Sequence, residues 1–245
     1  MNNLILFSLS IIMGLAFSAF AQDQFESDTI ATSAGDLKIT FVGHGTLMFE
    51  FNNLVIHVDP VGRYADYSKM PKADIILVTH HHSDHLDPAA IDLIQKKDTD
   101  ILLTKTCFDQ IKKGTVLSNG ESKSVKGIKV EAVPAYNLVH KRSSGEPFHP
   151  KGIGNGYVIT FGDKKVYVAG DTENVPEMKK LSGIDIAFLP VNLPYTMTPE
   201  MVADAVRMVN PKIFYPYHFG ETNLDELVKL LKDRDDMDIR IRKMQ

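Results

Sequence analysis

The sequence predicts a mixed α and β fold, and two observations lead to this prediction. The chain has 245 residues, of which 44% are hydrophobic, so one domain with one sizeable core is expected. Strand-like segments followed by helix-like segments occur in the first half of the chain and again in the second half. Two such halves are expected to form sheets that pack together with helices outside them.

The first half is rich in strand signals. Apolar or alternating segments predict strands, and Asn52-Asn53 predicts a tight hairpin turn. A helix is expected over 87–95, because Asp87 can cap its first turn and Pro88 suits the first helical position. The strands expected in this half cover 37–42, 46–51, 54–58, 75–78, 101–103, 122–125 and 128–133.

The second half repeats the pattern. Gly162-Asp163 predicts a hairpin turn, and Thr198-Pro199 predicts the start of a helix. Amphipathic spacing then predicts helices to about residue 209 and over 224–232. The strands expected here cover 157–161, 165–169, 184–189, 213–215 and 238–241.

The first residues resemble an export signal. Residues 2–19 contain no charged residue, and Ala19-Phe20-Ala21 matches an A-x-A cleavage pattern. A signal peptide over 1–21 is therefore expected, with an uncleaved membrane anchor as the alternative. The polar residues 22–36 are expected to form a flexible lead-in, and residues 37–245 to form the domain.

Composition limits the environment and the partners. Cys107 is the only cysteine, so an internal disulfide is excluded, and export then favours a periplasmic or secreted protein with no stable membrane anchor after cleavage. The net charge of −4 gives no indication of the basic surface that binds nucleic acid. A small-molecule substrate is the expected partner, and no oligomeric state is predicted.

The most informative segment is 79–87, Thr-His-His-His-Ser-Asp-His-Leu-Asp, directly after the apolar run 75–78. His80 and His82 are two residues apart and point the same way on extended backbone, whereas Asp84 and His85 project from the following turn. Imidazole and carboxylate suit zinc, manganese, iron or nickel, and burying so many ionisable groups without a cation would be costly. A metal site is therefore predicted, with His81 turned away from it.

The spacing His-x-His-x-Asp-His resembles the signature of the metallo-β-lactamase superfamily. That resemblance implies an α+β fold, a four-layer αββα sandwich with the site at one edge of the two sheets. Gly43-His44-Gly45 and Asp59-Pro60 resemble elements of the branch that contains ascorbate-phosphate lactonase-like and phospholipase D-like proteins.

The resemblance also implies ligands outside this segment. Asp171, in Ala-Gly-Asp-Thr, matches an aspartate that bridges two metal ions, and His218 resembles the last ligand histidine. Where many relatives carry Pro-Ala-x-His, this chain has Asn137, and an amide is a poorer zinc ligand than imidazole. His149 is expected to replace the missing histidine, with His140 as the second choice. Without a replacement, one ion instead of two is expected.

The implied roles are as follows. The first ion is assigned His80, His82 and His149, and the second Asp84, His85 and His218. Asp171 is expected to bridge the ions, and Asp84 to accept a proton from the attacking water, so both are assigned catalytic roles. Residues expected to support the ligands or to meet the substrate are His44, Asp59, Asn137 and Tyr195.

Zn²⁺ is the expected cofactor, at two ions per chain, with Mn²⁺, Ni²⁺ or iron as alternatives. The expected activity is hydrolysis of an ester, lactone or phosphodiester by metal-activated hydroxide. A non-catalytic metal-binding or sensing protein and a true β-lactamase are the alternatives. Lys141, Arg142 and Lys151 flank the His149 loop and are compatible with a phosphate-bearing substrate or with a solvated loop.

Overall fold

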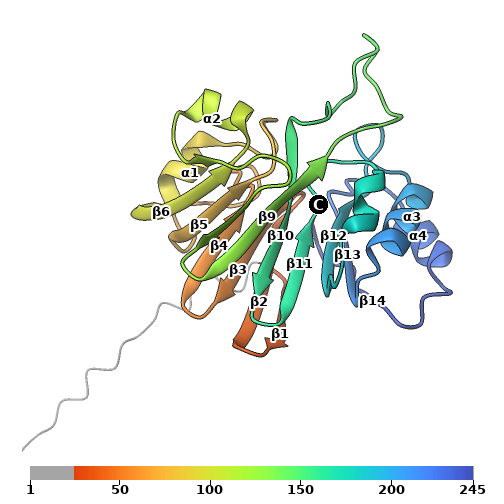
Figure 1. Cartoon of the computed structure of the whole chain (residues 1–245), viewed down its shortest axis with the longest axis horizontal. Helices are drawn as coiled ribbons and strands as arrows, with labels where there is room; N and C mark the ends of the chain where they lie inside the picture. Colours follow the sequence, from red (N-terminus) through yellow and green to blue (C-terminus); the bar gives the residue numbers. More distant parts are fainter. Residues whose placement is uncertain (1–24, 245) are drawn as a thin grey trace, which may run out of the picture.

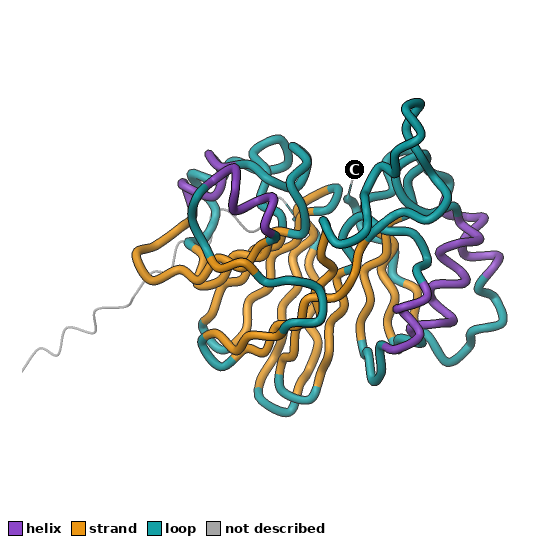
Figure 2. The backbone as a smooth tube through the Cα atoms, turned by 45° about the horizontal axis from the view of Figure 1, so that its top comes forward, coloured by secondary structure: helices purple, strands orange, loops and turns teal. Residues whose placement is uncertain are grey.

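The computed structural model describes residues 25–244 (Figure 1). The expected signal peptide, 1–21, and the start of the expected lead-in, 22–24, lie outside the described residues. Two seven-stranded sheets lie face to face, and helices cover their outer sides (Figure 2). The α+β, four-layer αββα prediction is confirmed.

The first sheet has its strands in the same order in space as in the chain. They are antiparallel from the first strand to the fourth and parallel from the fourth to the seventh. The strands are β1 Ser27–Thr32, β2 Gly35–Gly43, β3 Thr46–Phe51, β4 Leu54–Val58, β5 Ala73–Val78, β6 Gln95–Leu103 and β7 Thr115–Val116.

The second sheet has the same plan. It is antiparallel from β8 to β11 and parallel from β11 to β14. The strands are β8 Ser122–Val125, β9 Ile128–Ala135, β10 Gly154–Phe161, β11 Lys164–Val168, β12 Ile186–Pro190, β13 Ile213–Tyr217 and β14 Asp238–Ile239.

The helices form the two outer layers. The first sheet is covered by α1 Pro88–Ile94 and α2 Lys105–Ile111, and the second by η2 Pro176–Lys180, α3 Pro199–Val209 and α4 Leu224–Leu230 (Figure 1). Asp87 caps α1 by accepting from the backbone N–H groups of Ala89 and Ala90, as its sequence position predicts. Within residues 25–244, no helix is long and apolar enough to cross a bilayer.

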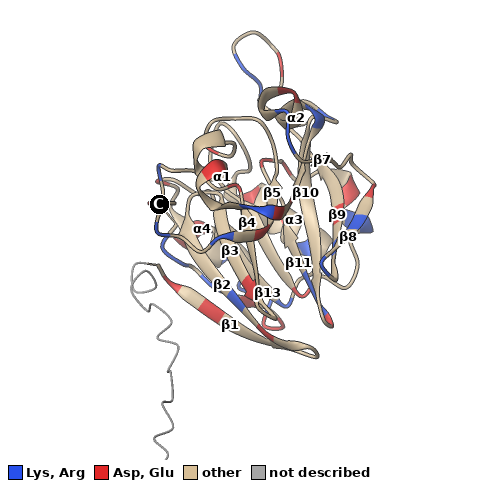
Figure 3. Cartoon of the chain, turned by 90° about the vertical axis from the view of Figure 1, so that its left-hand side faces the viewer, with Lys and Arg blue, Asp and Glu red and all other residues tan. Residues whose placement is uncertain are grey.

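The main core lies between the sheets. Alternate side chains of β2, Leu37, Ile39 and Phe41, are fully buried there, in keeping with the two-residue period of a strand. Aromatic contacts join the two layers, for example Phe49 to Phe161 with ring centroids 5.6 Å apart. Basic and acidic residues are interspersed over the strands and helices (Figure 3).

The expected lead-in contains a strand that the prediction missed. Residues 27–32 form β1, which pairs antiparallel with β2 from Ser27–Thr40 to Thr32–Gly35. The prediction of a flexible segment over 22–36 is wrong here because polar edge strands need few apolar residues. Asp28 anchors β1 through a 2.8 Å ion pair with Arg242 and through hydrogen bonds from Tyr215 and Arg240.

Two further differences occur in the first sheet. A strand was predicted to begin at residue 101, but β6 begins at Gln95. The polar residues 95–100 lengthen this strand at its start, where Gln95 pairs with Ala73 of β5. The short strand β7 has only two residues and gives no sequence signal. The predicted hairpins at Asn52-Asn53 and Gly162-Asp163 are confirmed by the pairs Phe51–Leu54 and Phe161–Lys164.

Candidate metal centre

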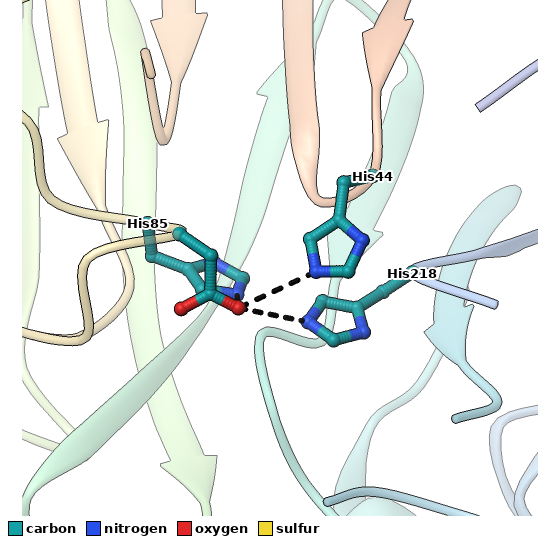
Figure 4. A group of neighbouring side chains, drawn as sticks. His44, His85 and His218 are labelled. Carbon is teal, nitrogen blue, oxygen red and sulfur yellow. Dashed lines mark hydrogen bonds and ion pairs between the residues drawn. The ribbon is translucent and has the colours of Figure 1, made fainter. Parts of the chain in front are cut away.

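The candidate ligands follow the ends of strands. His80, His82, Asp84 and His85 lie after β5, and Asp171 and His218 lie after β11 and at the end of β13. Because the carboxyl ends of parallel strands meet at one edge of a sheet, these side chains converge. The rings of His85, His44 and His218 approach one another from different parts of the chain (Figure 4).

Three groups of side chains are close enough to hold an ion, with ligand atoms within 4.8 Å of one another. Together they contain all seven predicted ligands and also His44. The groups are His44, Asp84, His85 and His218; His80, His82 and His149; and His80, His85 and Asp171. His81 and His140 belong to none of them.

The His80 group has the spacing of a zinc site. Nδ1 of His82 lies 3.2 Å from Nε2 of His80 and 3.2 Å from Nε2 of His149. Two nitrogens sharing a tetrahedral zinc ion at the usual Zn–N length of ~2.05 Å would be about 3.3 Å apart. His149, and not Asn137, is therefore the side chain that completes this group.

Asp171 lies between the two histidine clusters. One oxygen, Oδ2, is 3.2 Å from Nε2 of His149, and the other, Oδ1, is 3.3 Å from Nε2 of both His85 and His218. A carboxylate with one oxygen toward each cluster has the geometry needed to bridge two ions.

Several buried polar atoms of the site have no hydrogen-bond partner among the described residues: Nε2 of His85, Oδ1 of Asp171, and both ring nitrogens of His218. Such atoms are costly in a protein interior. Nitrogen and carboxylate oxygen are ligands for a divalent cation, so the residues present fit the metal site that the fold implies.

Asp59 orients His85 from behind. Its Oδ1 accepts from the backbone N–H of Thr79 at 2.7 Å, and its Oδ2 accepts from the Thr79 hydroxyl. The same Oδ2 lies 2.7 Å from Nδ1 of His85. Since an ionised carboxylate only accepts, Nδ1 carries the proton and Nε2 faces the site, as a ligand requires.

Asn137 orients His149 in the same way. Its Nδ2 faces two acceptors, Glu173 Oε1 and the backbone oxygen of Tyr195. The amide orientation is thereby fixed, and Oδ1 accepts from the backbone N–H and from Nδ1 of His149, each at 2.8 Å. Nε2 of His149 therefore carries no proton, and it faces His82 and Asp171.

Glu173 is a site residue that the sequence did not reveal. Its carboxylate is fully buried and accepts from the backbone N–H groups of Leu138, Val139 and His140, from Asn137 and from the ring of His140. This pairing explains why His140 does not act as the replacement ligand. An acidic residue two positions after Asp171 gives no sequence signal of such burial.

Burial and charge shift the acid–base equilibria of the site. Burial lowers the pKa of His80 well below its ordinary value, and burial with the neighbouring His149 lowers the pKa of His82 to about 4. For His85, burial acts in the same direction, but the carboxylates of Asp171 and Asp59 outweigh it and raise the pKa well above the ordinary value. Ion binding must therefore displace a proton from His85, so it is expected to release protons.

A cavity of about 430 Å³ opens onto both clusters. Besides cluster residues, its walls contain Tyr195, which was expected to meet the substrate, and Arg142. They also contain five side chains that were given no role: Arg63, Tyr64, Ser83, Phe148 and Asn192. A larger cavity of about 1000 Å³ lies beside β1–β4 and residues 69–72. No histidine lines this larger cavity, so the smaller cavity is the candidate substrate site.

Fold and site together define a metallo-β-lactamase-type protein. A family model described as "Beta-lactamase superfamily domain" matches residues 38–218. The chain belongs to this superfamily. Relatives that are at least 30% identical to it and are covered over more than 80% of their length are UPF0173 metal-dependent hydrolases, so the chain belongs to that family within the superfamily.

Relatives support this assignment. A UPF0173 metal-dependent hydrolase of Desulforamulus reducens is 31% identical over 197 residues, which cover 75% of this chain and 85% of the relative. A UPF0173 metal-dependent hydrolase of Thermococcus onnurineus is 29% identical over 218 residues, which cover 81% of this chain and 93% of the relative.

Solved structures agree. A candidate metal-dependent hydrolase of Parabacteroides distasonis is 51% identical, with a TM-score of 0.86 over 90% of this chain and 100% of that chain. A Thermotoga maritima protein described as a zinc-dependent hydrolase of the superfamily shares the fold, with 19% identity and a TM-score of 0.58 over 85% of this chain and 100% of that chain.

Proposed function

We propose that this protein is a dinuclear metal-dependent hydrolase that cleaves an ester, lactone or phosphodiester bond of a small molecule. One observation carries the proposal: the two oxygens of Asp171 lie 3.2–3.3 Å from histidine nitrogens of two different clusters. A single-ion site would have no use for a carboxylate held between two sets of imidazoles.

The proposed ligand sets follow the clusters. His80, His82 and His149 would hold one ion, Asp84, His85 and His218 the other, and Asp171 both. Zn²⁺ fits this histidine-rich set best, with Mn²⁺, Ni²⁺ and iron as alternatives. When bound, such ions supply hydroxide at neutral pH and stabilise negative charge on substrate oxygens.

The chain's own residues then do the remaining work. Asp84 is part-exposed to the cavity, and its Oδ2 lies 3.4 Å from Nε2 of His44 and 3.6 Å from Nε2 of His218. We assign to Asp84 the role of accepting a proton from the attacking water, and to His44 that of holding Asp84 in this orientation. Asp59 and Asn137 keep His85 and His149 in the tautomers that present Nε2.

The proposal also includes export. The Ala19-Phe20-Ala21 pattern supports removal of residues 1–21 and a periplasmic or secreted protein without a stable membrane anchor. Identification of the N-terminal residue of protein recovered from the secreting cell tests this, and a chain that still begins at Met1 would refute it.

The decisive experiment measures metal content and hydrolysis on residues 22–245 purified without chelator. Two ions per chain and turnover of 4-nitrophenyl esters, lactones or phosphodiesters are expected. Asp171→Ala should lose both ions and turnover, whereas His81→Ala, which removes a neighbouring histidine outside the ligand groups, should keep them. If both ions are bound and none of these substrates is hydrolysed, a metal-binding or sensing protein is favoured instead.

A further inference from the structure

Two arginines stand out because they have no ion pair with a carboxylate among residues 25–244. Of the six arginines, all of which lie in the described part of the chain, four form ion pairs or hydrogen bonds with aspartates: Arg207, Arg234, Arg240 and Arg242. Arg63 and Arg142 form no such ion pair among residues 25–244, and both line the cavity above the metal clusters. Unpaired guanidinium groups at a cavity wall are suited to an anionic ligand.

Arg142 is held in place without being neutralised. Its guanidinium lies 5.0 Å from the centroid of the Phe148 ring, and Nη2 lies 3.3 Å from the backbone oxygen of Phe148. Nη2 also lies 3.5 Å from Nε2 of His82. Stacking and a backbone acceptor fix the direction of the guanidinium and leave its charge available.

The charge of the cavity favours an anion. The carboxylates in its walls are Asp84 and Asp171, and both belong to the groups that would hold ions. With two divalent ions bound, those carboxylates are outweighed by the ions alone. Arg63 and Arg142 therefore add to a net positive cavity in a protein whose overall charge is −4.

One wall of the same cavity is apolar. Phe148 and Tyr195 contact each other with ring centroids 5.1 Å apart. Four of the seven exposed large hydrophobic residues found in the described chain lie on the two adjoining loops: Leu138, Val139, Leu193 and Tyr195. Asn137 joins these loops by donating to the Tyr195 backbone oxygen at 2.9 Å. Of these residues only Tyr195 lines the cavity itself, together with Phe148, and the other three extend the exposed apolar surface on the loops beside it. Exposed apolar side chains next to a cavity indicate an apolar ligand surface.

We propose that the substrate is an amphiphilic anion. Apart from the bond that is cleaved, it carries a carboxylate or phosphate bound by Arg142 and an apolar chain or ring that packs on Phe148 and Tyr195. The identity of the cleaved bond rests on the proposed function, whereas the anion and apolar contacts do not.

Binding of product-like acids to the zinc-loaded protein tests this without requiring turnover. The probes are linear dicarboxylates and monocarboxylates of four to eight carbons, measured by titration calorimetry at low ionic strength. One carboxylate of each probe can occupy the metal site, and only a dicarboxylate has a second one for Arg142. At the best chain length, the dicarboxylate should bind at least about tenfold more tightly than its monocarboxylate, beyond the twofold statistical factor, because charged hydrogen bonds are strong.

Arg142→Gln should abolish this preference, and the matched control Lys141→Gln should retain it. Lys141 is the adjacent exposed cation and lies outside the cavity walls. Added salt should reduce the preference. Tyr195→Ser, at an exposed position, should weaken the binding of the eight-carbon monocarboxylate more than that of the four-carbon monocarboxylate.

Equal affinity for the two series at every length, or a preference that survives Arg142→Gln, would overturn this inference. Each result is separable from the proposed function. Hydrolysis by a protein that shows no dicarboxylate preference overturns only the substrate inference. A clear preference in a zinc-loaded protein that hydrolyses none of the model substrates argues against the hydrolase alone.

Discussion

Asn137 Oδ1 lies 2.8 Å from Nδ1 of His149. The residue at the position where many superfamily members carry a ligand histidine thus supports the histidine that replaces it. Under the proposed ligand assignment, the imidazole comes from a neighbouring loop, and the side chain at position 137 orients it.

Asn137→Ala should therefore weaken metal binding without unfolding the protein. Loss of Oδ1 frees the His149 ring to rotate and to change tautomer, and supporting hydrogen bonds of this kind are worth roughly 10–100-fold in metal affinity. Competition with a chromophoric chelator measures the affinity. Asn174→Ala, which removes an exposed amide bonded to Asp204, is the control and should bind zinc normally.

Glu173→Gln should destabilise the loop that carries Asn137. The buried carboxylate accepts from three backbone N–H groups, and an amide in its place loses the charge and turns a donor toward donors. A loss of about 2–3 kcal/mol in the free energy of unfolding is expected, measured by urea denaturation with chelator present. An unchanged midpoint would contradict the role given to Glu173.

Asp28→Asn should loosen β1 from the C-terminal segment. Its carboxylate accepts from Arg242, Arg240 and Tyr215, and the amide loses the ionic part of these contacts, at a cost of about 1–3 kcal/mol. Hydrogen exchange of residues 27–32 should accelerate. Asp36→Asn, at an exposed position of β2 in the same hairpin, should leave that exchange rate as it is.

His57 should contribute to a rise in stability with pH between about 4 and 6.5, in addition to His80 and His82 in the ion-free protein. The ring of His57 is fully buried, and burial lowers its pKa to about 4, below the ~6.5 of an unfolded histidine. The unfolded chain therefore binds more protons in that window, so up to about 3 kcal/mol present above pH 6.5 is lost as the pH falls toward 4. His57→Leu should flatten the slope, measured by denaturation with chelator. A slope equal to that of the wild type would show that other groups cause it.

Removing the ions should lower the thermal midpoint, and added Zn²⁺ should restore it. When the free ion concentration is 100 times the dissociation constant, binding stabilises the folded state by about 2.7 kcal/mol. This gain should shrink from pH 7 to pH 5 because His85, whose pKa is raised by the carboxylates of Asp171 and Asp59, must give up a proton to bind an ion. Calorimetric scans with chelator and with zinc at each pH check both statements.

The sequence anticipated the parts of the site that depend on local spacing. His80, His82, Asp84 and His85 occupy one strand-end loop, and the strand before it is visible as an apolar run. His149 could be proposed because the chain lacked a histidine elsewhere, and the resemblance to a known family supplied the expectation that one was needed. Asp171 and His218 were predicted as ligands because the motifs that follow their strands resemble those of the same family.

Other features depend on contacts that no local pattern encodes. Glu173 is an ordinary loop acid in the sequence, and its importance comes from three backbone N–H groups that the fold brings to it. β1 has a single large apolar residue, Ile30, and is held by arginines more than 200 positions away. Arg63 lies in a loop of the first sheet and reaches the same cavity as Arg142, which only the folded arrangement reveals.

The division of the ligands between the two sheets has a consequence for maturation. His44, His80, His82, Asp84 and His85 belong to the first sheet and its loops, whereas His149, Asp171 and His218 belong to the second. Each of the three ligand groups contains a member from both. Neither half contains a complete group alone, so complete ion binding requires that both halves are folded together. In a protein with one cysteine, bound ions would link the two halves without a covalent bond, and ion uptake would report that the two halves have packed together.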